Sequence, residues 1–303
     1  MSRAVVFWEY GDPDVLRVVD VESPTPGPGE VRVRVRAAGV QPFDTNFRAG
    51  RLDWARARFP QRLGTEVAGV VDAVGPDVAG LAVGDEVLGA VSGGYADHVL
   101  ARPDHLARKP ADMPWAEAGG LAASGRTAVY VLRQLDVGAG DTLLVHAAAG
   151  GVGSMAVQVA RARGAAVIGT ASPRNHDHLT SLGATPVAYG DGLVERVRAV
   201  APAGVDAALD AAGTEEAARA SLELVGDQQR VVTIVGDSPA ERLGIRMVSA
   251  QPTEEMLAEL VDLYETGRLR VSVYRTFPLD RAADAHREVE ARHVRGKVVL
   301  LTD

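Results

Sequence analysis

The chain changes from one hydrophobic pattern to another near residue 110. Before that point, short apolar runs are separated by glycine and proline, and residues 31–35 (VRVRV) alternate strictly between apolar and charged positions. Strict alternation predicts a half-buried strand whose arginines face outward. Short strands divided by Gly and Pro turns predict a compact β-rich domain.

The elements expected in this first part follow one another closely. Residues 4–8 and 16–19 flank a turn and predict a hairpin, whereas the Pro/Gly-rich residues 21–30 predict a linker. Residues 37–50 predict a loop followed by a short helix. Further strands are expected at 64–74, 83–87 and 93–100.

From about residue 115, helical and strand patterns alternate, beginning with an alanine-rich, largely helical stretch at 115–135. The alternation predicts an α/β fold with a doubly wound parallel sheet. The last ~35 residues have strand–helix–strand character and are expected to rejoin the first domain. The expected strands are 142–146, 166–170, 185–188, 205–209, 230–234, 271–277 and 297–301, and the expected helices are 153–163, 175–182, 193–201, 215–225, 254–266 and 281–292.

A glycine turn joins the strand and the helix within residues 143–163 (LLVHAAAGGVGSMAVQVARAR). This setting predicts a dinucleotide-binding turn, because glycine lets the backbone approach a pyrophosphate and the helix N-terminus offers free N–H groups to it. Ala147 takes the first place of the motif. A glycine motif is also compatible with a merely flexible turn. The candidate cofactor-binding residues of the turn are Gly150, Gly151, Val152 and Gly153.

The end of the next expected strand points to NADPH rather than NADH. Dinucleotide sites for NADH place a carboxylate there to bind the ribose 2′-hydroxyl, but residues 164–176 contain no Asp or Glu. Ser172, Arg174 and Asn175 stand in its place, and these residue types can bind a 2′-phosphate. Alternatively, Ser172 is a helix N-cap, with Pro173 at the first helical position and Arg174 exposed to solvent.

Composition narrows the function classes. The chain has 303 residues, is 47% hydrophobic and has a formal net charge of −8, which argues against a nucleic-acid surface. It has no cysteine, so disulfides, thiolate zinc sites and cysteine nucleophiles are excluded. Neither a signal peptide nor an apolar run of ~18–20 residues is evident, so we expect a cytoplasmic protein without a membrane partner.

Several stretches together resemble one known family. AAGVQPFDTNFRAG, GTEVAGVVDAVG, GGYADHV, HAAAGGVG and HVRGKVVL are similar, in this order, to the zinc-free, quinone oxidoreductase-like branch of the medium-chain dehydrogenase/reductases. The resemblance implies a GroES-like catalytic domain formed by residues 1–120 and 266–303 and a Rossmann NADPH-binding domain formed by residues 121–265. It also implies an active site between the domains and a homodimer joined through the Rossmann sheet.

The departures from the family concern metal and substrate. Zinc-dependent relatives carry cysteine and a His-Glu pair where this chain has Gln41 and Thr65-Glu66, so we expect no zinc. Glu66 is then expected to be a buried ion-pair partner or hydrogen-bonded carboxylate. The quinone-reductase branch usually has Asn in place of Gln41 and often has Tyr in place of Asn46. The relatives' dimer-edge strands normally lie in the region of residues 234–254, which is shorter here.

The chemistry expected without zinc is hydride addition to a quinone or to an alkene conjugated with a carbonyl. Charge then develops on the carbonyl oxygen, and hydrogen-bond donors suffice to stabilise it. The candidate catalytic donors are Gln41, Asn46 and Thr127, and the resemblance places Thr127 beside the nicotinamide. It also suggests Tyr189 near the adenosine ribose-phosphate and Gly236 near the nicotinamide. Asp44 and His146 are expected to be a cap and a packed residue, respectively.

The leading hypothesis is therefore an NADPH-dependent, zinc-independent reductase of quinones or α,β-unsaturated carbonyls, with an enoyl reductase of secondary metabolism as a variant. The partner would be a small-molecule substrate. A second hypothesis is a low-turnover NADPH-binding protein with a structural or redox-sensing role, as in zeta-crystallin-like relatives. Consumption of NADPH with a panel of quinones and enones separates the two.

Overall fold

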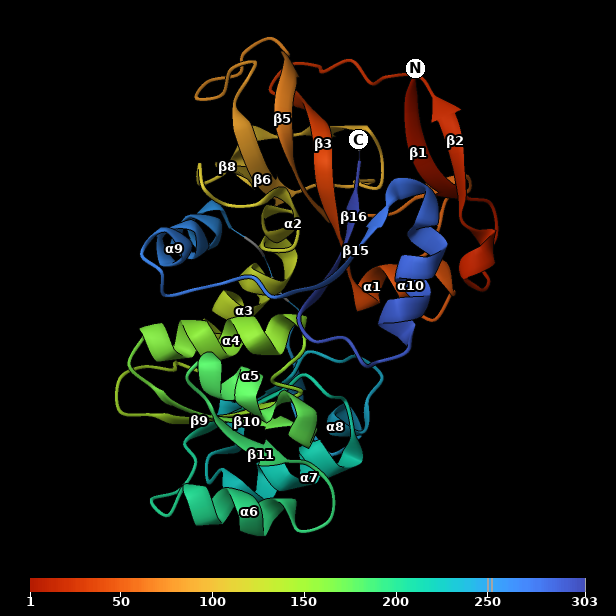
Figure 1. The fold of residues 1–303 in the computed structure, drawn as a ribbon. Helices are drawn as coiled ribbons and strands as arrows, with labels where there is room; N and C mark the ends of the chain where they lie inside the picture. Colours follow the sequence, from red (N-terminus) through yellow and green to blue (C-terminus); the bar gives the residue numbers. More distant parts are fainter. Residues whose placement is uncertain (250, 252, 303) are drawn as a thin grey trace. The chain divides into compact units, whose positions relative to one another are not determined.

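The computed structural model describes residues 1–249, 251 and 253–302, and their contacts divide the chain into two units (Figure 1). Unit 1 comprises Met1–Ala123, Thr253–Val261 and Val271–Asp303. Unit 2 comprises Ser124–Pro252 and Asp262–Arg270. Helix α9 (Glu254–Glu265) therefore contributes residues to both units.

Unit 1 is built around a mostly antiparallel seven-stranded sheet in the order β15-β16-β3-β5-β6-β8, with β7 also paired to β3. A second sheet has three strands in the order β2-β1-β4. The strands are β1 (Ser2–Phe7), β2 (Arg17–Val21), β3 (Val31–Val40), β4 (Gln61–Arg62), β5 (Glu66–Val74), β6 (Glu86–Ala90), β7 (His98–Ala101), β8 (Leu106–Arg108), β15 (Val273–Pro278) and β16 (Lys297–Leu301). The helices are α1 (Pro42–Arg48), α2 (Trp115–Ala118) and α10 (Ala282–Glu290), with 3-10 turns η1 (Pro13–Val15), η2 (Pro103–His105) and η5 (Leu279–Arg281).

Strand β3 organises this sheet, because it pairs with three other strands. Its alternating residues place Val31, Val33 and Val35 in the core, as the VRVRV pattern predicts. The strand is longer than predicted, since Ala37–Val40 continue it instead of forming a loop. These residues pair with Val298–Leu301 of β16, so the C-terminal strand accounts for the extension.

Unit 2 holds a six-stranded, wholly parallel sheet in the order β11-β10-β9-β12-β13-β14, which is the doubly wound arrangement expected. Figure 1 shows α4 and α5 on one side of it and α6 and α7 on the other. Its strands are β9 (Thr142–His146), β10 (Ala166–Ala171), β11 (Thr185–Ala188), β12 (Ala207–Asp210), β13 (Val231–Thr233) and β14 (Arg246–Met247). The helices are α3 (Ala122–Gln134), α4 (Gly151–Ala162), α5 (His176–Ser181), α6 (Leu193–Val200), α7 (Glu215–Leu224) and α8 (Pro239–Arg242), with 3-10 turns η3 (Pro173–Asn175) and η4 (Gln228–Arg230).

The stretch at 115–135 is largely helical, as predicted, but it holds two helices, α2 and α3, and the pattern missed the break between them at Gly119-Gly120. A Cβ on Gly119 would lie 2.6 Å from the Ala37 Cβ. Close approach to β3 therefore requires a glycine at a position where an uninterrupted helix would prefer alanine. Strands β4, β8 and β14 and helix α8 were also missed by the sequence pattern, since each has only two to four residues.

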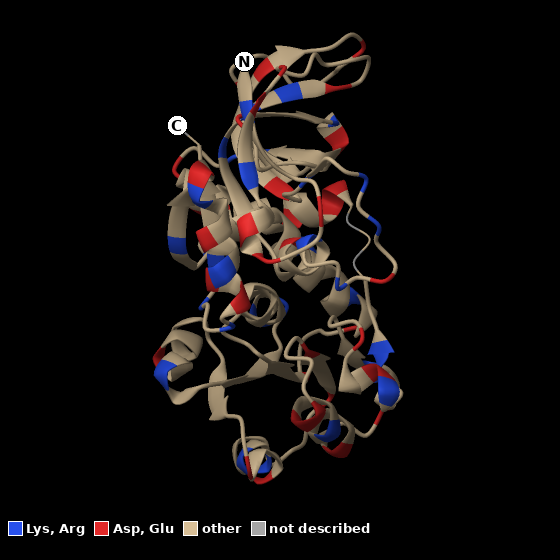
Figure 2. Ribbon diagram, turned by 90° about the vertical axis from the view of Figure 1, so that its right-hand side faces the viewer, with Lys and Arg blue, Asp and Glu red and all other residues tan. Residues whose placement is uncertain are grey.

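Charged residues of both signs are interspersed along the ribbon in the view of Figure 2. None of the helices in the described part of the chain combines the length and the apolarity that crossing a bilayer requires.

Candidate functional site

The glycine turn between β9 and α4 is shaped by close packing. Gly150 is the N-cap of α4, and no side chain caps this end of the helix. A Cβ on Gly153 would lie 2.4 Å from the carbonyl oxygen of Ala147, so the helix can begin this close to the strand only with glycine there. Ala147 itself has φ +53°, a left-handed conformation that glycine adopts more readily.

The turn lies beside the end of β10, where the 2′-phosphate residues were predicted. Ala148 N–H donates to the carbonyl of Thr170 at 3.1 Å, which joins the turn to the neighbouring strand. Ser172 is the N-cap of η3, but its side chain makes no capping bond, and the Asn175 amide donates to its hydroxyl at 3.4 Å. Arg174 is exposed, and within the described residues no hydrogen bond or ion pair engages its guanidinium.

The parallel sheet brings further candidates to the same edge. Tyr189 directly follows β11 and is 58% exposed, and Gly236 lies three residues beyond β13. A Cβ on Gly236 would meet only the Met247 methyl group, at 3.9 Å, so the protein itself does not require glycine there. Thr127 is half-buried on α3. The sheet order thus gathers the glycine turn, the segment after β10 and these two loops at its carboxyl edge.

Asp210, which the sequence analysis did not single out, fixes two of the loops at this edge. It is fully buried at the end of β12 and accepts hydrogen bonds from the N–H groups of Ala212 and Gly213, both at 2.9 Å. The Thr233 hydroxyl at the end of β13 donates to the same carboxyl group at 2.9 Å. One side chain therefore ties the loops after β12 and β13 together. An Asp at the end of an apolar strand was the only signal in the sequence.

His146 ends β9 behind the glycine turn and is buried, as expected. Its Nδ1 lies 3.3 Å from the Thr170 hydroxyl and its Nε2 lies 3.1 Å from the Ser221 hydroxyl. Burial lowers the pKa of His146 to about 4, although the nearby Asp210 acts in the opposite direction. The imidazole is therefore neutral at physiological pH, and it links β9 to β10 and α7.

In unit 1, α1 begins with a buried polar cluster. Gln41 is its N-cap and forms a capping box with Asp44, whose carboxylate accepts from the Gln41 N–H at 2.9 Å. The Asp44 carboxyl group also accepts hydrogen bonds from the Tyr95 hydroxyl at 2.9 Å and from the Gly64 N–H at 3.2 Å. Burial raises the pKa of Asp44 to about 6 despite these bonds. The expected capping role of Asp44 is confirmed.

A second buried cluster joins α1 to the sheet through Glu66. Lys297 Nζ lies 2.9 Å from Glu66 Oε1, and both side chains are at least 98% buried. The Gln41 amide donates to the same carboxylate, and the Ala123 N–H donates to its other oxygen at 2.7 Å. A Cβ on Gly39 would lie 2.0 Å from Glu66 Oε1, so glycine makes room for the carboxylate.

The two candidate amides of this region differ in availability. Gln41 is 8% exposed and already donates to Glu66. Asn46 is half-buried on α1, and among the described residues its side-chain amide has no hydrogen-bond partner. Asn46 is thus the amide that can offer both N–H groups to a ligand.

Comparison with known proteins gives the chain its family. Residues 27–132 match the alcohol dehydrogenase GroES-like domain, and residues 182–300 match the zinc-binding dehydrogenase domain. A quinone oxidoreductase of Pseudomonas aeruginosa is 34% identical, and the alignment covers 99% of this chain and 100% of the relative. The chain belongs to the zinc-free, quinone oxidoreductase-like branch of the medium-chain dehydrogenase/reductases.

Other similar proteins come from this reductase superfamily and from polyketide synthases. The pikromycin polyketide synthase component PikAII of Streptomyces venezuelae is 40% identical over 88% of this chain, but the chain spans only 8% of that relative. A mycobacterial structure, Rv1454c complexed with NADPH, superposes with a TM-score of 0.88 at 32% identity over 99% of both chains. The CurK enoyl reductase structure has a TM-score of 0.90 at 27% identity over 100% of this chain and 99% of its own.

Within this reductase family, the positions of the zinc ligands carry other chemistry here. Gln41 and Glu66 are bonded to one another, and Glu66 pairs with Lys297, which confirms the interpretation of Glu66 as a buried ion-pair partner. Among the described residues, no group of three or more His, Cys, Asp or Glu side chains could hold a metal ion. The sequence analysis took Lys297 only as part of the terminal family motif HVRGKVVL and missed its pairing with Glu66, because 231 residues separate the two.

Proposed function

We propose that this protein is an NADPH-dependent, zinc-independent reductase that adds a hydride to a quinone or to an α,β-unsaturated carbonyl compound. Family membership supports a reductase, and the CurK structure of an enoyl reductase supports an enoyl-type substrate as one form of it. The observation that carries the cofactor preference is the exposed guanidinium of Arg174, which has no partner among the described residues and lies close in sequence to Ser172 and Asn175.

The residues present at the carboxyl edge of the unit 2 sheet fit NADPH. The uncapped N-terminus of α4 would face the pyrophosphate, and Gly153 would keep the backbone within reach of it. Arg174, Ser172 and Asn175 would bind the 2′-phosphate, Tyr189 would lie along the adenosine ribose and Gly236 would admit the nicotinamide. The mycobacterial neighbour with bound NADPH supports this assignment.

The substrate chemistry requires hydrogen-bond donors rather than a metal. NADPH supplies the hydride when it is bound. As electron density moves onto the substrate carbonyl oxygen, the Asn46 amide would donate to that oxygen and lower the energy of the enolate. The Thr127 hydroxyl would orient the nicotinamide amide, and the buried Gln41–Glu66–Lys297 cluster would hold the start of α1 in place.

The cofactor assignment is tested with the Arg174→Ala variant. Loss of a charge-assisted contact to phosphate costs about 1.5–3 kcal/mol, so we expect kcat/KM for NADPH to fall about 10- to 100-fold. The value for NADH should change by less than about 3-fold, because NADH has no 2′-phosphate for Arg174 to bind. Steady-state kinetics with both cofactors and a reducible quinone measures this split.

Arg219→Ala provides a matched control, since Arg219 is an equally exposed arginine of unit 2 that pairs with Glu215 on α7. It should leave both cofactor constants unchanged. Equal losses with NADPH and NADH in Arg174→Ala would refute the 2′-phosphate assignment. Tight NADPH binding without oxidation by any quinone or enone would refute the reductase and favour the low-turnover structural or redox-sensing role.

We also propose the homodimer that the family resemblance implies, with the edge strand β14 of the unit 2 sheet at its centre. Arg246 and Met247, the two residues of this strand, are both exposed. Parallel pairing continues from β13 to β14, and in the described part of the chain no further strand pairs with the outer side of β14, where a partner could add. Sedimentation equilibrium should give the mass of a dimer for the wild-type protein and of a monomer for Met247→Pro.

A further inference from the structure

An exposed chain of aromatic rings lies on unit 1 around α1. Four of the chain's five phenylalanines take part, and each ring contacts the next with centroids 5.2 to 6.3 Å apart. We call this set the aromatic platform. Its members, in order of contact, are Trp54, Phe43, Phe47, Phe7, Phe59 and Tyr10.

The platform is buried at its centre and open at its ends. Phe7 is fully buried in β1, whereas Trp54 is 70%, Phe59 42% and Phe43 38% exposed. Phe43 and Phe47 are stacked with an interplanar angle of 8°, and Trp54 is tilted by 32° against Phe43. Phe43 and Trp54 thus expose apolar ring surface next to each other, and exposed apolar surface of this kind typically marks a binding site.

The loop that carries Trp54 and Phe59 is fixed by hydrogen bonds at three points. Arg51 N–H donates to the carbonyl of Asn46 at 3.0 Å, and Ala55 N–H donates to that of Leu52 at 3.0 Å. Ala57 N–H donates to the Tyr10 hydroxyl at 2.7 Å. The bond to Tyr10 therefore ties the loop between α1 and β4 to the platform, and the other two bonds join the loop to α1 and fix its internal turn.

This loop is strongly basic in a chain whose net charge is −8. Between residues 48 and 62 there are five arginines and a single acidic residue, Asp53. Arg51, Arg56 and Arg58 are exposed, and within the described residues no side-chain hydrogen bond or ion pair engages them. Burial lowers the pKa of Arg48 against the opposite effect of Glu290, and the nearby charge of Arg51 lowers this pKa further.

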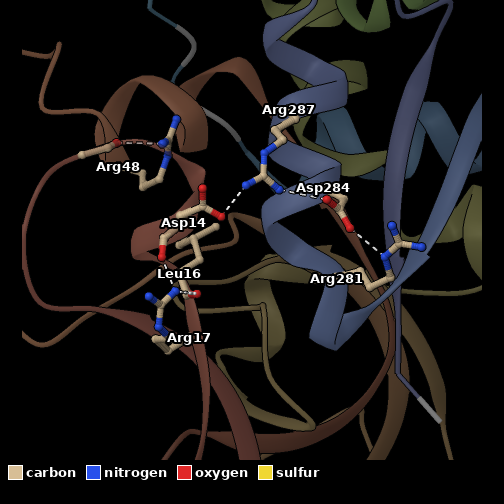
Figure 3. Close-up of polar contacts among 8 residues, drawn as sticks. Asp14, Leu16, Arg17, Arg48, Arg281, Asp284 and Arg287 are labelled. Carbon is tan, nitrogen blue, oxygen red and sulfur yellow. Dashed lines mark hydrogen bonds and ion pairs between the residues drawn. The ribbon is translucent and has the colours of Figure 1, made fainter.

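Several arginines elsewhere on unit 1 are paired with carboxylates. Figure 3 shows Arg287 between Asp14 and Asp284, with Arg281 bound to the other side of Asp284. Arg275 likewise pairs with Glu288 at 2.7 Å. Arg51, Arg56 and Arg58 have no such carboxylate partner among the described residues, so they leave positive charge available to an anion.

A helix face joins the rings to a hydrogen-bond donor. Phe43, Asn46 and Phe47 are spaced i, i+3 and i+4 on α1, so they lie on one face of the helix. Asn46, whose amide has no hydrogen-bond partner among the described residues, thus shares a helix face with the stacked rings. One small region of unit 1 offers ring surfaces for stacking, an amide for a carbonyl oxygen and guanidinium groups for a negative charge.

We propose that the aromatic platform and the unpaired arginines Arg51, Arg56 and Arg58 form a binding site for a flat, conjugated carbonyl compound that carries a carboxylate, sulfonate or phosphate group. The rings stack on the conjugated system, Asn46 donates to its carbonyl oxygen and the arginines bind its anionic group. This assignment rests on the proposed reductase function, because it identifies the class of substrate that the site takes.

The test uses two probes, 1,4-naphthoquinone-2-sulfonate and unsubstituted 1,4-naphthoquinone, titrated calorimetrically against the full chain without NADPH. We expect the wild type to bind the sulfonate about 10-fold more tightly at low salt, with the preference shrinking as ionic strength rises. The triple variant R51Q/R56Q/R58Q should lose the preference and still bind the neutral quinone. Trp54→Ala should weaken both probes alike, by about 5- to 10-fold.

The control is R198Q/R219Q/R268Q, which removes the same charge from exposed, acid-paired arginines of unit 2. It should retain the preference for the sulfonate. Equal binding of the two probes by the wild type, or an equal loss in the control, would overturn the proposal. A sulfonate preference that survives in R51Q/R56Q/R58Q would overturn it as well. The single variant R56Q should lose part of the sulfonate preference.

Because binding is measured without cofactor, the two proposals fail separately. If the sulfonate preference depends on the three arginines but no quinone or enone supports NADPH oxidation, the anionic site is supported and the reductase is refuted. Rapid reduction of naphthoquinone with no arginine-dependent preference supports the reductase and refutes the anionic site.

Discussion

His146 and His286 are both buried, one in each unit, but their surroundings differ. Both ring nitrogens of His146 have hydroxyl partners, from Thr170 and Ser221. Neither nitrogen of His286, on α10, has a hydrogen-bond partner in the described part of the chain, and its ring meets Tyr95 edge-on at 5.9 Å. Burial lowers the pKa of both, to about 4 for His146 and to about 3 for His286.

The difference extends to the polar groups around each histidine. Unit 2 holds its buried network together with neutral hydroxyls, backbone N–H groups and one carboxyl group, at the edge where we place NADPH. Unit 1 buries a full ion pair, Glu66–Lys297, and within the described residues it leaves the imidazole of His286 without a hydrogen-bond partner. Replacing one side chain should therefore lower the free energy of unfolding strongly where a buried charge loses its partner. The decrease should be small where the replaced side chain already lacks hydrogen-bond partners.

The largest effect is expected from Lys297→Met. The substitution leaves the fully buried Glu66 carboxylate without its positively charged partner. Removal of one partner of a buried ion pair lowers the free energy of unfolding by about 3–5 kcal/mol. Urea unfolding of the wild type and the variant at pH 7 measures the change. Glu66→Gln in the same chain should recover part of the loss, because it removes the stranded charge.

Lys109→Met is the comparison that sharpens this prediction. Lys109 is also buried, and its Nζ lies 3.0 Å from Glu86, but the side chain of Glu86 is 47% exposed and water can solvate it. We expect a loss of about 1–2 kcal/mol, mostly from the carbonyls of Pro110 and Met113 that lose their donor. Equal losses in the two variants would mean that burial of the partner is not what makes Lys297 important.

The next largest effect concerns the loss of folding stability at acid pH. A histidine whose pKa is lowered on folding contributes stability that is complete above its unfolded value of about 6.5 and is lost as the pH falls through its folded value. For His286 this window runs from about 6.5 to about 3. His286→Phe removes the dependence, so its unfolding free energy should fall less steeply with acid, by up to about 1.4 kcal/mol per pH unit.

His146→Phe should show the same relief in acid but differ at pH 7. It leaves the Thr170 and Ser221 hydroxyls without their imidazole partner, and we expect a loss of about 2 kcal/mol at pH 7, against less than about 1 kcal/mol for His286→Phe. Asp44 acts in the opposite sense over pH 4 to 6, because its raised pKa favours the protonated folded state. Both variants retain Asp44, so their difference from the wild type isolates each histidine.

The same contrast explains which parts of the structure the sequence predicts. Strands β9, β11 and β16 match their predicted bounds, since each is a short apolar run closed by turn residues. Their parallel order in unit 2 follows from the alternation of strand and helix, and so does the edge with Ser172, Arg174 and Asn175. Local patterns suffice wherever the partner of a residue lies in the next element.

Distant pairings have no such signal. The buried partner of Glu66 is 231 residues away, and Lys297 looks like part of an ordinary turn before a strand. The platform ring Phe7 lies far in sequence from Phe47 and Phe59, and those contacts depend on the pairing of β1 with β4. The sequence analysis predicted a hairpin at one end of these contacts and a loop at the other. It gave no reason to expect that the two lie side by side.

The smallest predicted effect lies in the backbone of the glycine turn. Ala147 has φ +53°, and a left-handed conformation costs an L-residue about 1–2 kcal/mol, whereas glycine adopts it freely. Glycine also loses more chain entropy on folding, so we expect Ala147→Gly to stabilise unit 2 by less than about 1 kcal/mol. Ala148→Gly next to it, at a residue without positive φ, should instead destabilise the protein, and thermal unfolding of the two variants in parallel measures the difference in sign. Stabilisation by both would mean that the turn gains from glycine for a reason other than the conformation of Ala147.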